Sequence, residues 1–133
     1  MAAVTITWED QLRFDGIDSK GIPVDIDGRQ EYGVRPSDLL PMALASCSGV
    51  DLVSQLGKKL DALSIQVSFT KEPDPPWKFQ RFRLHYLVSG RSLTAAEVEA
   101  AIHRSHEEMC SVAAAVRGNV PVETSFELVA RSS

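Results

Sequence analysis

The sequence predicts a single α+β domain, and three observations support this expectation. Segments with strand-like alternation and segments with helical periodicity follow one another in the order strands, helix, strands, helix, strand. The length of 133 residues suits one domain with a sizeable core. No repeat, linker or low-complexity tract interrupts the chain, so we expect one domain over residues 1–133.

The N-terminal part of the chain has the pattern of a small meander. Apolar side chains alternate with threonines over residues 4–8, which is typical of a half-buried strand. Residues 12–26 contain two short apolar stretches separated by the segment DSKG, which favours a turn. We therefore expect a strand followed by a hairpin.

Helical periodicity begins at Ser37 and continues to about residue 59. Leu39, Ala43, Cys47 and Val50 recur at spacings of four, four and three, which predicts an apolar stripe on a helix. Because proline lacks an N–H group, the regular helix is expected to start or kink at Pro41. Residues 40–50 are apolar on nearly all sides, which indicates cover from several directions, including a partner subunit.

The second half of the chain predicts two strands, a helix and a final strand. Alternation over residues 65–69 and 82–88 indicates the two strands. Thr94 and Glu97 fit a capping box, so a helix should begin there and run to about residue 109. Cys110 follows, then a short helical stretch, and the last strand occupies residues 120–128.

Composition excludes several classes of partner. The formal charge is −4, from 14 basic and 18 acidic residues without long runs of one sign, so no nucleic acid is expected as a partner. The apolar stretches are shorter than the roughly 20 residues of a membrane span, and the N-terminal residues do not resemble a secretion signal. We expect a cytoplasmic protein that does not interact with a membrane.

The two cysteines, Cys47 and Cys110, are the main candidates for chemistry. In a reducing compartment, a cysteine pair is more often reactive than a structural disulfide. A thiolate at Cys47 would need a basic neighbour from elsewhere in the fold, since the helix dipole fades within the first turn. Packing of Cys47 as a small buried residue is the alternative interpretation.

A metal or nucleotide site has little support. His103, His106 and Cys110 share one face of the second helix, as metal ligands can, but the charged residues around them favour a solvated surface. The glycine pattern of a phosphate-binding loop is absent from the sequence. We therefore expect no cofactor and no metal.

Two long segments resemble the cysteine motifs of the OsmC/Ohr family. RPSDLLPMALASCSGVDL is similar to the family's first motif, which ends in the reactive cysteine, and MCSVAAAVRGNVPVETSFEL is similar to its second. The resemblance implies an OsmC-like two-layer fold, with antiparallel sheets around a central cysteine-bearing helix, in an intertwined homodimer. It covers nearly the whole chain.

The same resemblance implies a function, namely that of an antioxidant thiol peroxidase of the stress response. Cys47 would reduce an organic or fatty-acyl hydroperoxide and become a sulfenic acid, which agrees with general thiol chemistry. Cys110 would then form a disulfide with Cys47, and a dithiol reductant of the lipoyl type would reopen it.

Family peroxidases also hold an arginine near the thiolate by means of an acidic residue. Asp38 is the acidic candidate in this sequence, and the basic residue remains open among Arg13, Lys20, Arg29 and Arg35. The alternative function is a non-catalytic OsmC-like dimer that binds a small apolar ligand or senses oxidation.

Overall fold

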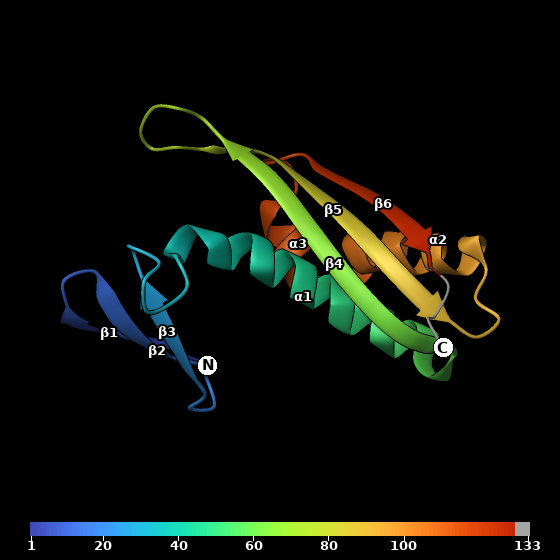
Figure 1. Ribbon diagram of the computed structural model, residues 1–133, viewed down its shortest axis with the longest axis horizontal. Coiled ribbons are helices and arrows are strands. Elements are labelled where there is room, and N and C mark those ends of the chain that lie inside the picture. Colours follow the sequence, from blue (N-terminus) through green and yellow to red (C-terminus); the bar gives the residue numbers. More distant parts are fainter. Residues whose placement is uncertain (130–133) are drawn as a thin grey trace. The chain divides into compact units, whose positions relative to one another are not determined.

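The computed structural model describes residues 1–129 and divides the chain into two compact units (Figure 1). The first unit comprises Met1–Leu40 and the second begins at Pro41.

The first unit contains a three-stranded antiparallel sheet. Its strands are β1 (Thr5–Asp10), β2 (Arg13–Ile17) and β3 (Pro23–Asp27), in the order β1-β2-β3. A side chain at Gly16 would come within 3.2 Å of the Ile26 side chain and of the Val24 carbonyl, which accounts for the glycine inside β2. The predicted strand and hairpin are confirmed.

A compact loop joins β3 to the first helix. The buried Asp27 carboxylate accepts hydrogen bonds from the backbone N–H groups of Arg29 and Tyr32, at 2.9 and 3.1 Å. These bonds, that of Arg29 above all, hold the pKa of Asp27 below its ordinary value. A side chain at Gly33 would lie 2.5 Å from the Asp25 carbonyl oxygen, so the loop passes β3 too closely for any other residue.

The remaining elements follow in chain order. They are α1 (Pro36–Leu56), a 3₁₀ turn (Gly57–Lys59), β4 (Leu60–Lys71), β5 (Phe79–Gly90), α2 (Ala95–Arg104), a π-helical turn η2 (Ser105–Met109), α3 (Ser111–Val116) and β6 (Val122–Leu128).

The sheet of the second unit is mixed, whereas antiparallel sheets were expected. β4 pairs with β5 in antiparallel register, but β6 runs parallel to β5, with Phe82 opposite Val122 and Val88 opposite Leu128. The chain leaves the end of β5 and returns to its start through α2 and α3. Such a helical crossover delivers the next strand in the same direction.

One face of this sheet is covered by helices, which makes the second unit two-layered (Figure 1). Phe82, Leu84, Tyr86 and Val88 alternate along β5 and are almost completely buried. On this face α1 contacts β5 through Ser48 and Tyr86, and α1 contacts α2 through a hydrogen bond from Gln55 Nε2 to the Ala101 carbonyl at 3.0 Å.

Helix α1 is buried along one side only. The buried side carries Pro41, Leu44, Ser48, Asp51 and Leu52. The apolar side chains of Met42, Val50 and Val53, by contrast, are more than half exposed. Val50 therefore lies outside the buried stripe on which the sequence pattern had placed it.

The expected start of the helix at Pro41 is wrong, whereas the alternative expectation of a kink at Pro41 stays a prediction. The helix begins at Pro36 and continues through the buried Pro41, because loss of one N–H group near a helix start removes a single backbone hydrogen bond. The segment Pro36–Lys59 is long and apolar enough to span a membrane, with a mean hydropathy of 1.3. Its buried side carries the polar residues Ser48 and Asp51, which bond to the rest of the unit, as in a core helix.

The boundary of α2 is confirmed, but its end differs from the prediction. Thr94 caps the helix by accepting a hydrogen bond from the Glu97 N–H at 3.2 Å. Regular α-helix stops at Arg104, and the chain then widens into the π-helical turn η2. This turn leads directly to Cys110.

Candidate functional site

Cys47 lies in the middle of α1, at the boundary between the buried and the exposed side of the helix. Its thiol is free and its side chain is half-buried. Ser48, the next residue, is fully buried, whereas Ser46 on the other side is exposed. Cys47 is thus partly accessible to solvent.

Cys110 is held by local backbone structure on both sides. Its N–H donates to the Ser105 carbonyl at 2.7 Å, which closes η2. Its Sγ accepts a hydrogen bond from the Ala113 N–H at 3.3 Å and thereby caps α3. The side chain is only 3% exposed.

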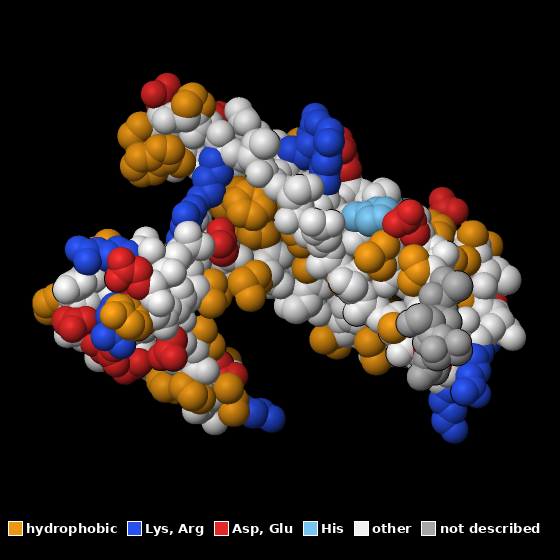
Figure 2. Space-filling view, viewed as in Figure 1, with side chains coloured by type: hydrophobic (Ala, Val, Ile, Leu, Met, Phe, Trp, Pro, Cys, Tyr) orange, Lys and Arg blue, Asp and Glu red, His pale blue; other side chains and the backbone are white. Residues whose placement is uncertain are grey.

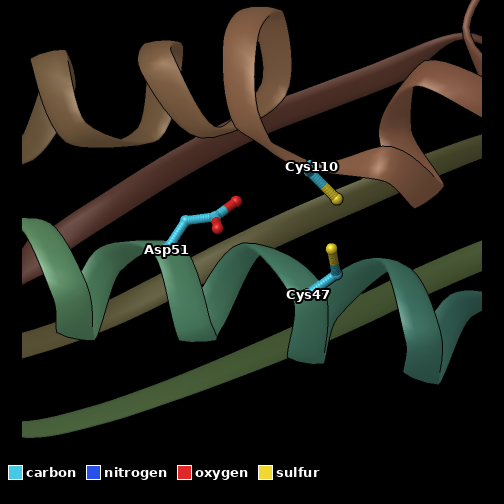
Figure 3. Close-up of side chains that lie close together, drawn as sticks. All are labelled: Cys47, Asp51 and Cys110. Atoms are coloured by element: carbon cyan, nitrogen blue, oxygen red, sulfur yellow. The ribbon is translucent and has the colours of Figure 1, made fainter.

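The two sulfurs point toward one another across the interface between α1 and the α2–α3 segment (Figure 3). Cys47 Sγ, Cys110 Sγ and an oxygen of Asp51 all lie within 4.8 Å of one another. A disulfide holds its sulfurs at about 2.05 Å, so the two thiols must approach further to form one. The structure thus brings together the two cysteines that the sequence singled out.

The surroundings keep Cys110 protonated. Burial raises the pKa of the Cys110 thiol above its ordinary value, and hydrogen bonding to Cys47 raises it further. The hydrogen bond from the Ala113 N–H acts in the opposite direction but is the smaller effect. At neutral pH, Cys110 is therefore a neutral thiol beside Cys47.

Asp51 is a third member of the site that sequence reasoning missed. The residue is 9% exposed, and its carboxylate accepts a hydrogen bond from Ser105 Oγ at 2.7 Å. Among the residues that the structure describes, no lysine or arginine forms an ion pair with Asp51. The sequence feature that could have identified Asp51 is its position four residues after Cys47, which puts both side chains on one helical face.

A chain of hydroxyl groups continues from Asp51 into the core. Ser105 Oγ lies 3.1 Å from Ser48 Oγ, which lies 2.7 Å from the Tyr86 hydroxyl. The Tyr86 hydroxyl in turn lies 2.8 Å from His106 Nε2. Ser48, Ser105 and Tyr86 are each fully buried, so these bonds satisfy groups that would otherwise be costly to bury.

Burial also changes the acidity of the two ring side chains. It raises the pKa of Tyr86 to about 12, so the phenol stays protonated. It lowers the pKa of His106, since burial disfavours the imidazolium form. His106 is therefore a half-buried, hydrogen-bonded residue and does not lie on the solvated surface expected from its charged neighbours.

A cavity of the second unit lies beside the helices that follow β5. It has a volume of about 590 Å³ and is bordered by α2, η2, α3 and β6, with His106, Arg117 and Phe126 among its lining residues. His106 also ends the hydroxyl chain, so this residue lies between the cavity and the thiol site.

Asp38 and the four basic candidates lie in the first unit. Asp38, in the first turn of α1, accepts a hydrogen bond from Gln30 Nε2 at 3.1 Å, and Arg35 donates to Gln30 Oε1 at 2.6 Å. Arg29 donates to Gln11, and Arg13 lies over the Tyr32 ring. Lys20 is exposed. Which of these basic residues approaches Cys47 stays a prediction.

The possible metal ligands are also different from those considered from the sequence. His106 bonds to Tyr86, and the Cys110 sulfur points toward Cys47. Over residues 1–129, the group whose donor atoms are close enough to share a metal ion is Cys47, Asp51 and Cys110.

Comparison with known proteins decides the family. Residues 27–125 match the family described as OsmC-like protein. The chain belongs to the OsmC family. A relative of this OsmC-like chain, Protein YhfA of Escherichia coli, is 33% identical over 129 residues, which cover 94% of the chain and 96% of YhfA.

Solved structures agree with this OsmC-like fold. An OsmC-like protein from Mycoplasma pneumoniae superimposes with a TM-score of 0.84 at 15% identity, covering 97% of each chain. The organic hydroperoxide resistance protein OhrB of Bacillus subtilis superimposes with a TM-score of 0.63 at 22% identity, covering 96% of this chain and 98% of OhrB. At such identities the likeness concerns the fold. Family membership together with two neighbouring cysteines indicates a redox role.

Proposed function

We propose that this chain is a thiol-dependent peroxidase that reduces organic hydroperoxides, fatty-acyl hydroperoxides included, in the cytoplasm. The observation that carries the proposal is the approach of Cys47 and Cys110, 63 positions apart in sequence, to within 4.8 Å. One of the two thiols is accessible and the other is buried, as expected of an attacking and a resolving cysteine.

The proposed reaction uses both thiols in turn. The Cys47 thiolate attacks the outer peroxide oxygen, the O–O bond breaks, and the alkoxide leaves as an alcohol after taking a proton. Solvent supplies that proton, and the neighbouring Cys110 thiol, which is held protonated, loses its own proton to solvent in a separate step. The Cys110 thiolate then attacks the Cys47 sulfenic acid, forming the disulfide and releasing hydroxide, which takes a proton from solvent.

Two further parts of the proposal concern partners. A dithiol reductant of the lipoyl type would reopen the disulfide by thiol exchange. A second copy of the chain would cover the exposed apolar side of α1, and Asp38 would orient one of the basic residues Arg13, Lys20, Arg29 or Arg35 toward a thiolate. The exposed side chains of Met42, Val50 and Val53 support the dimer.

The direct test is to mix reduced protein with cumene hydroperoxide and count thiols over time. We expect two thiols to be lost per chain, with one alcohol formed for each disulfide. Cys47→Ser should abolish consumption of the peroxide.

Cys110→Ser serves as the matched variant because it leaves the attacking thiol in place. It should still react once with peroxide and give a sulfenic acid that dimedone traps at Cys47. Unchanged turnover in Cys47→Ser would overturn the proposal.

A second candidate function is a non-catalytic OsmC-like dimer that binds a small apolar ligand or senses oxidation. The raised pKa of Cys110, and the presence of a carboxylate beside the thiol pair, favour slow thiols. In that case Cys47→Ala would leave ligand binding intact, and peroxide would be consumed no faster than by free cysteine.

A further inference from the structure

Three metal-binding donors, two thiols and a carboxylate, converge at the thiol site from two different segments. Cys47 and Asp51 lie on successive turns of α1, and Cys110 lies at the junction of η2 and α3. Their donor atoms are all within 4.8 Å of one another, and Figure 3 shows the three side chains pointing into the same space. Two of the three, Asp51 and Cys110, are buried.

We propose that reduced Cys47, Cys110 and Asp51 form a binding site for one Zn²⁺ ion. Zinc binds thiolates at about 2.3 Å and carboxylates at about 2.0–2.2 Å, so a tetrahedral ion holds such donors roughly 3.6–3.8 Å apart. This spacing lies within the 4.8 Å that the donors already share. Thiolates select zinc over magnesium or calcium, which prefer oxygen ligands.

The groups around the donors are those that a zinc ion needs. Ser105 Oγ bonds to Asp51 Oδ2 at 2.7 Å, which orients the carboxylate and leaves its other oxygen for a cation. The Ala113 N–H bonds to Cys110 Sγ at 3.3 Å and would stabilise a thiolate there. Both contacts exist before any metal binds, so the ligands are largely preorganised.

The charge of Asp51 also favours a bound cation. Asp51 is a buried carboxylate that accepts a hydrogen bond from a neutral hydroxyl group, and in the part of the chain that the structure describes no lysine or arginine forms an ion pair with it. Burial of an uncompensated carboxylate is unfavourable. A divalent cation supplies the missing positive charge and holds both cysteines as thiolates.

Three protein ligands leave a fourth coordination position open to water. Cys47 is the half-exposed member of the three ligands. Zinc binding would also connect the site to redox chemistry, a consequence that rests on the proposed peroxidase function. A hydroperoxide that takes two electrons and two protons would leave an alcohol, water, the Cys47–Cys110 disulfide and a released Zn²⁺ ion.

The test uses the reduced full-length protein, freed of metal with a chelator, without any peroxide. Native mass spectrometry after addition of Zn²⁺ should show one ion per chain. Co²⁺ in place of Zn²⁺ should give thiolate-to-cobalt charge-transfer absorption, which reports sulfur ligation directly. Absence of bound zinc, or a cobalt spectrum without that absorption, would contradict the proposed zinc site.

Variants identify the ligands. Cys47→Ser, Cys110→Ser and Asp51→Asn should each weaken zinc binding by at least about 10-fold in competition with a chromophoric chelator. His103→Gln is the matched control, because His103 is exposed on α2, and it should bind zinc like the unaltered protein. Loss of zinc in His103→Gln, or full affinity in Asp51→Asn, would contradict the assignment.

The binding assay and the peroxidase assay can fail separately. If the protein binds zinc but does not consume hydroperoxide, the zinc site is supported and the proposed enzymatic function is wrong. If the protein consumes hydroperoxide but does not bind zinc, the enzymatic function is supported and the zinc site is wrong.

Discussion

Cys110 differs from Cys47 in its surroundings, and this difference has a kinetic consequence. Burial and the neighbouring thiol raise the pKa of Cys110 above its ordinary value of 9.0, so only a small fraction is thiolate at neutral pH. Because the thiolate is the attacking form, its amount rises about tenfold for each pH unit below the pKa.

We therefore predict that disulfide formation, after Cys47 has been oxidised, accelerates about tenfold between pH 7 and pH 8. Quenched-flow alkylation followed by mass spectrometry measures the disulfide directly. In Cys110→Ser the sulfenic acid at Cys47 should persist at both pH values. A rate that does not change with pH would mean that Cys110 is already ionised.

Tyr86 connects the thiol site to the core through two hydrogen bonds. Its hydroxyl lies 2.7 Å from Ser48 Oγ and 2.8 Å from His106 Nε2, and its side chain is fully buried. Tyr86→Phe removes both hydrogen bonds and leaves Ser48 only its bond with Ser105, so we predict a loss of about 1–3 kcal/mol in the free energy of unfolding at neutral pH. Urea denaturation followed by circular dichroism measures it.

The raised pKa of Tyr86 also predicts that the free energy of unfolding decreases at high pH. The pKa of Tyr86 is raised from 10.0 to about 12 in the folded protein, so its contribution is complete below pH 10 and is lost as the pH rises toward 12. That contribution amounts to roughly 3 kcal/mol. Tyr86→Phe should lack this component of the alkaline loss, and equal slopes for both proteins above pH 10 would contradict the assignment.

At the scale of elements, the boundary of α2 is important because this helix leads to Cys110. Thr94 caps its first turn, and Val98, Ala101 and Ile102 bury its inner side. We predict that Thr94→Ala lowers the free energy of unfolding by about 1 kcal/mol, since the Glu97 N–H loses its partner. Thr94→Ser keeps the hydroxyl group and should remain close to the unaltered protein in the same denaturation assay.

The end of this helix illustrates what local patterns cannot predict. The sequence predicted continuous helix to about residue 109, but the last turn, Ser105–Met109, is π-helical. The wider turn carries the Ser105 hydroxyl toward Asp51 and the Cys110 sulfur toward Cys47. Tertiary contacts of this kind favour a π turn, and such turns are frequent at functional sites.

The direction of β6 is a second example. The alternation over residues 120–128 correctly predicted a strand, which the structure has at Val122–Leu128. Parallel and antiparallel strands carry the same alternation, so the sequence pattern does not distinguish them. The parallel pairing with β5 follows from the helical crossover between the two strands.

At the scale of the whole molecule, the exposed apolar side of α1 predicts association. The helix is apolar on nearly all sides, and on its exposed side Val50 and Val53 are 66% and 53% exposed. Apolar patches of this kind mark interaction surfaces. Figure 2 shows further hydrophobic side chains on the visible surface of the protein.

We predict that the unaltered protein sediments as a dimer and that Val50→Glu or Val53→Glu shifts it to the monomer without unfolding it. Substitution at an exposed site changes the free energy of folding of a single chain by only about 0.5 kcal/mol or less. Ala100→Glu, which adds the same charge at an exposed position of α2, is the matched control and should remain dimeric. A monomeric unaltered protein would contradict the proposed assembly.

The sequence by itself determined the α+β class, most element positions, the family and the two cysteines, because periodicity, capping residues and motifs are local properties of a chain. Only the tertiary structure decided that the cysteines meet, that Asp51 joins them, and that Ser48, Ser105, Tyr86 and His106 form one hydrogen-bonded chain. These contacts join residues 20 to 63 positions apart, and such distances in space depend on how the elements pack.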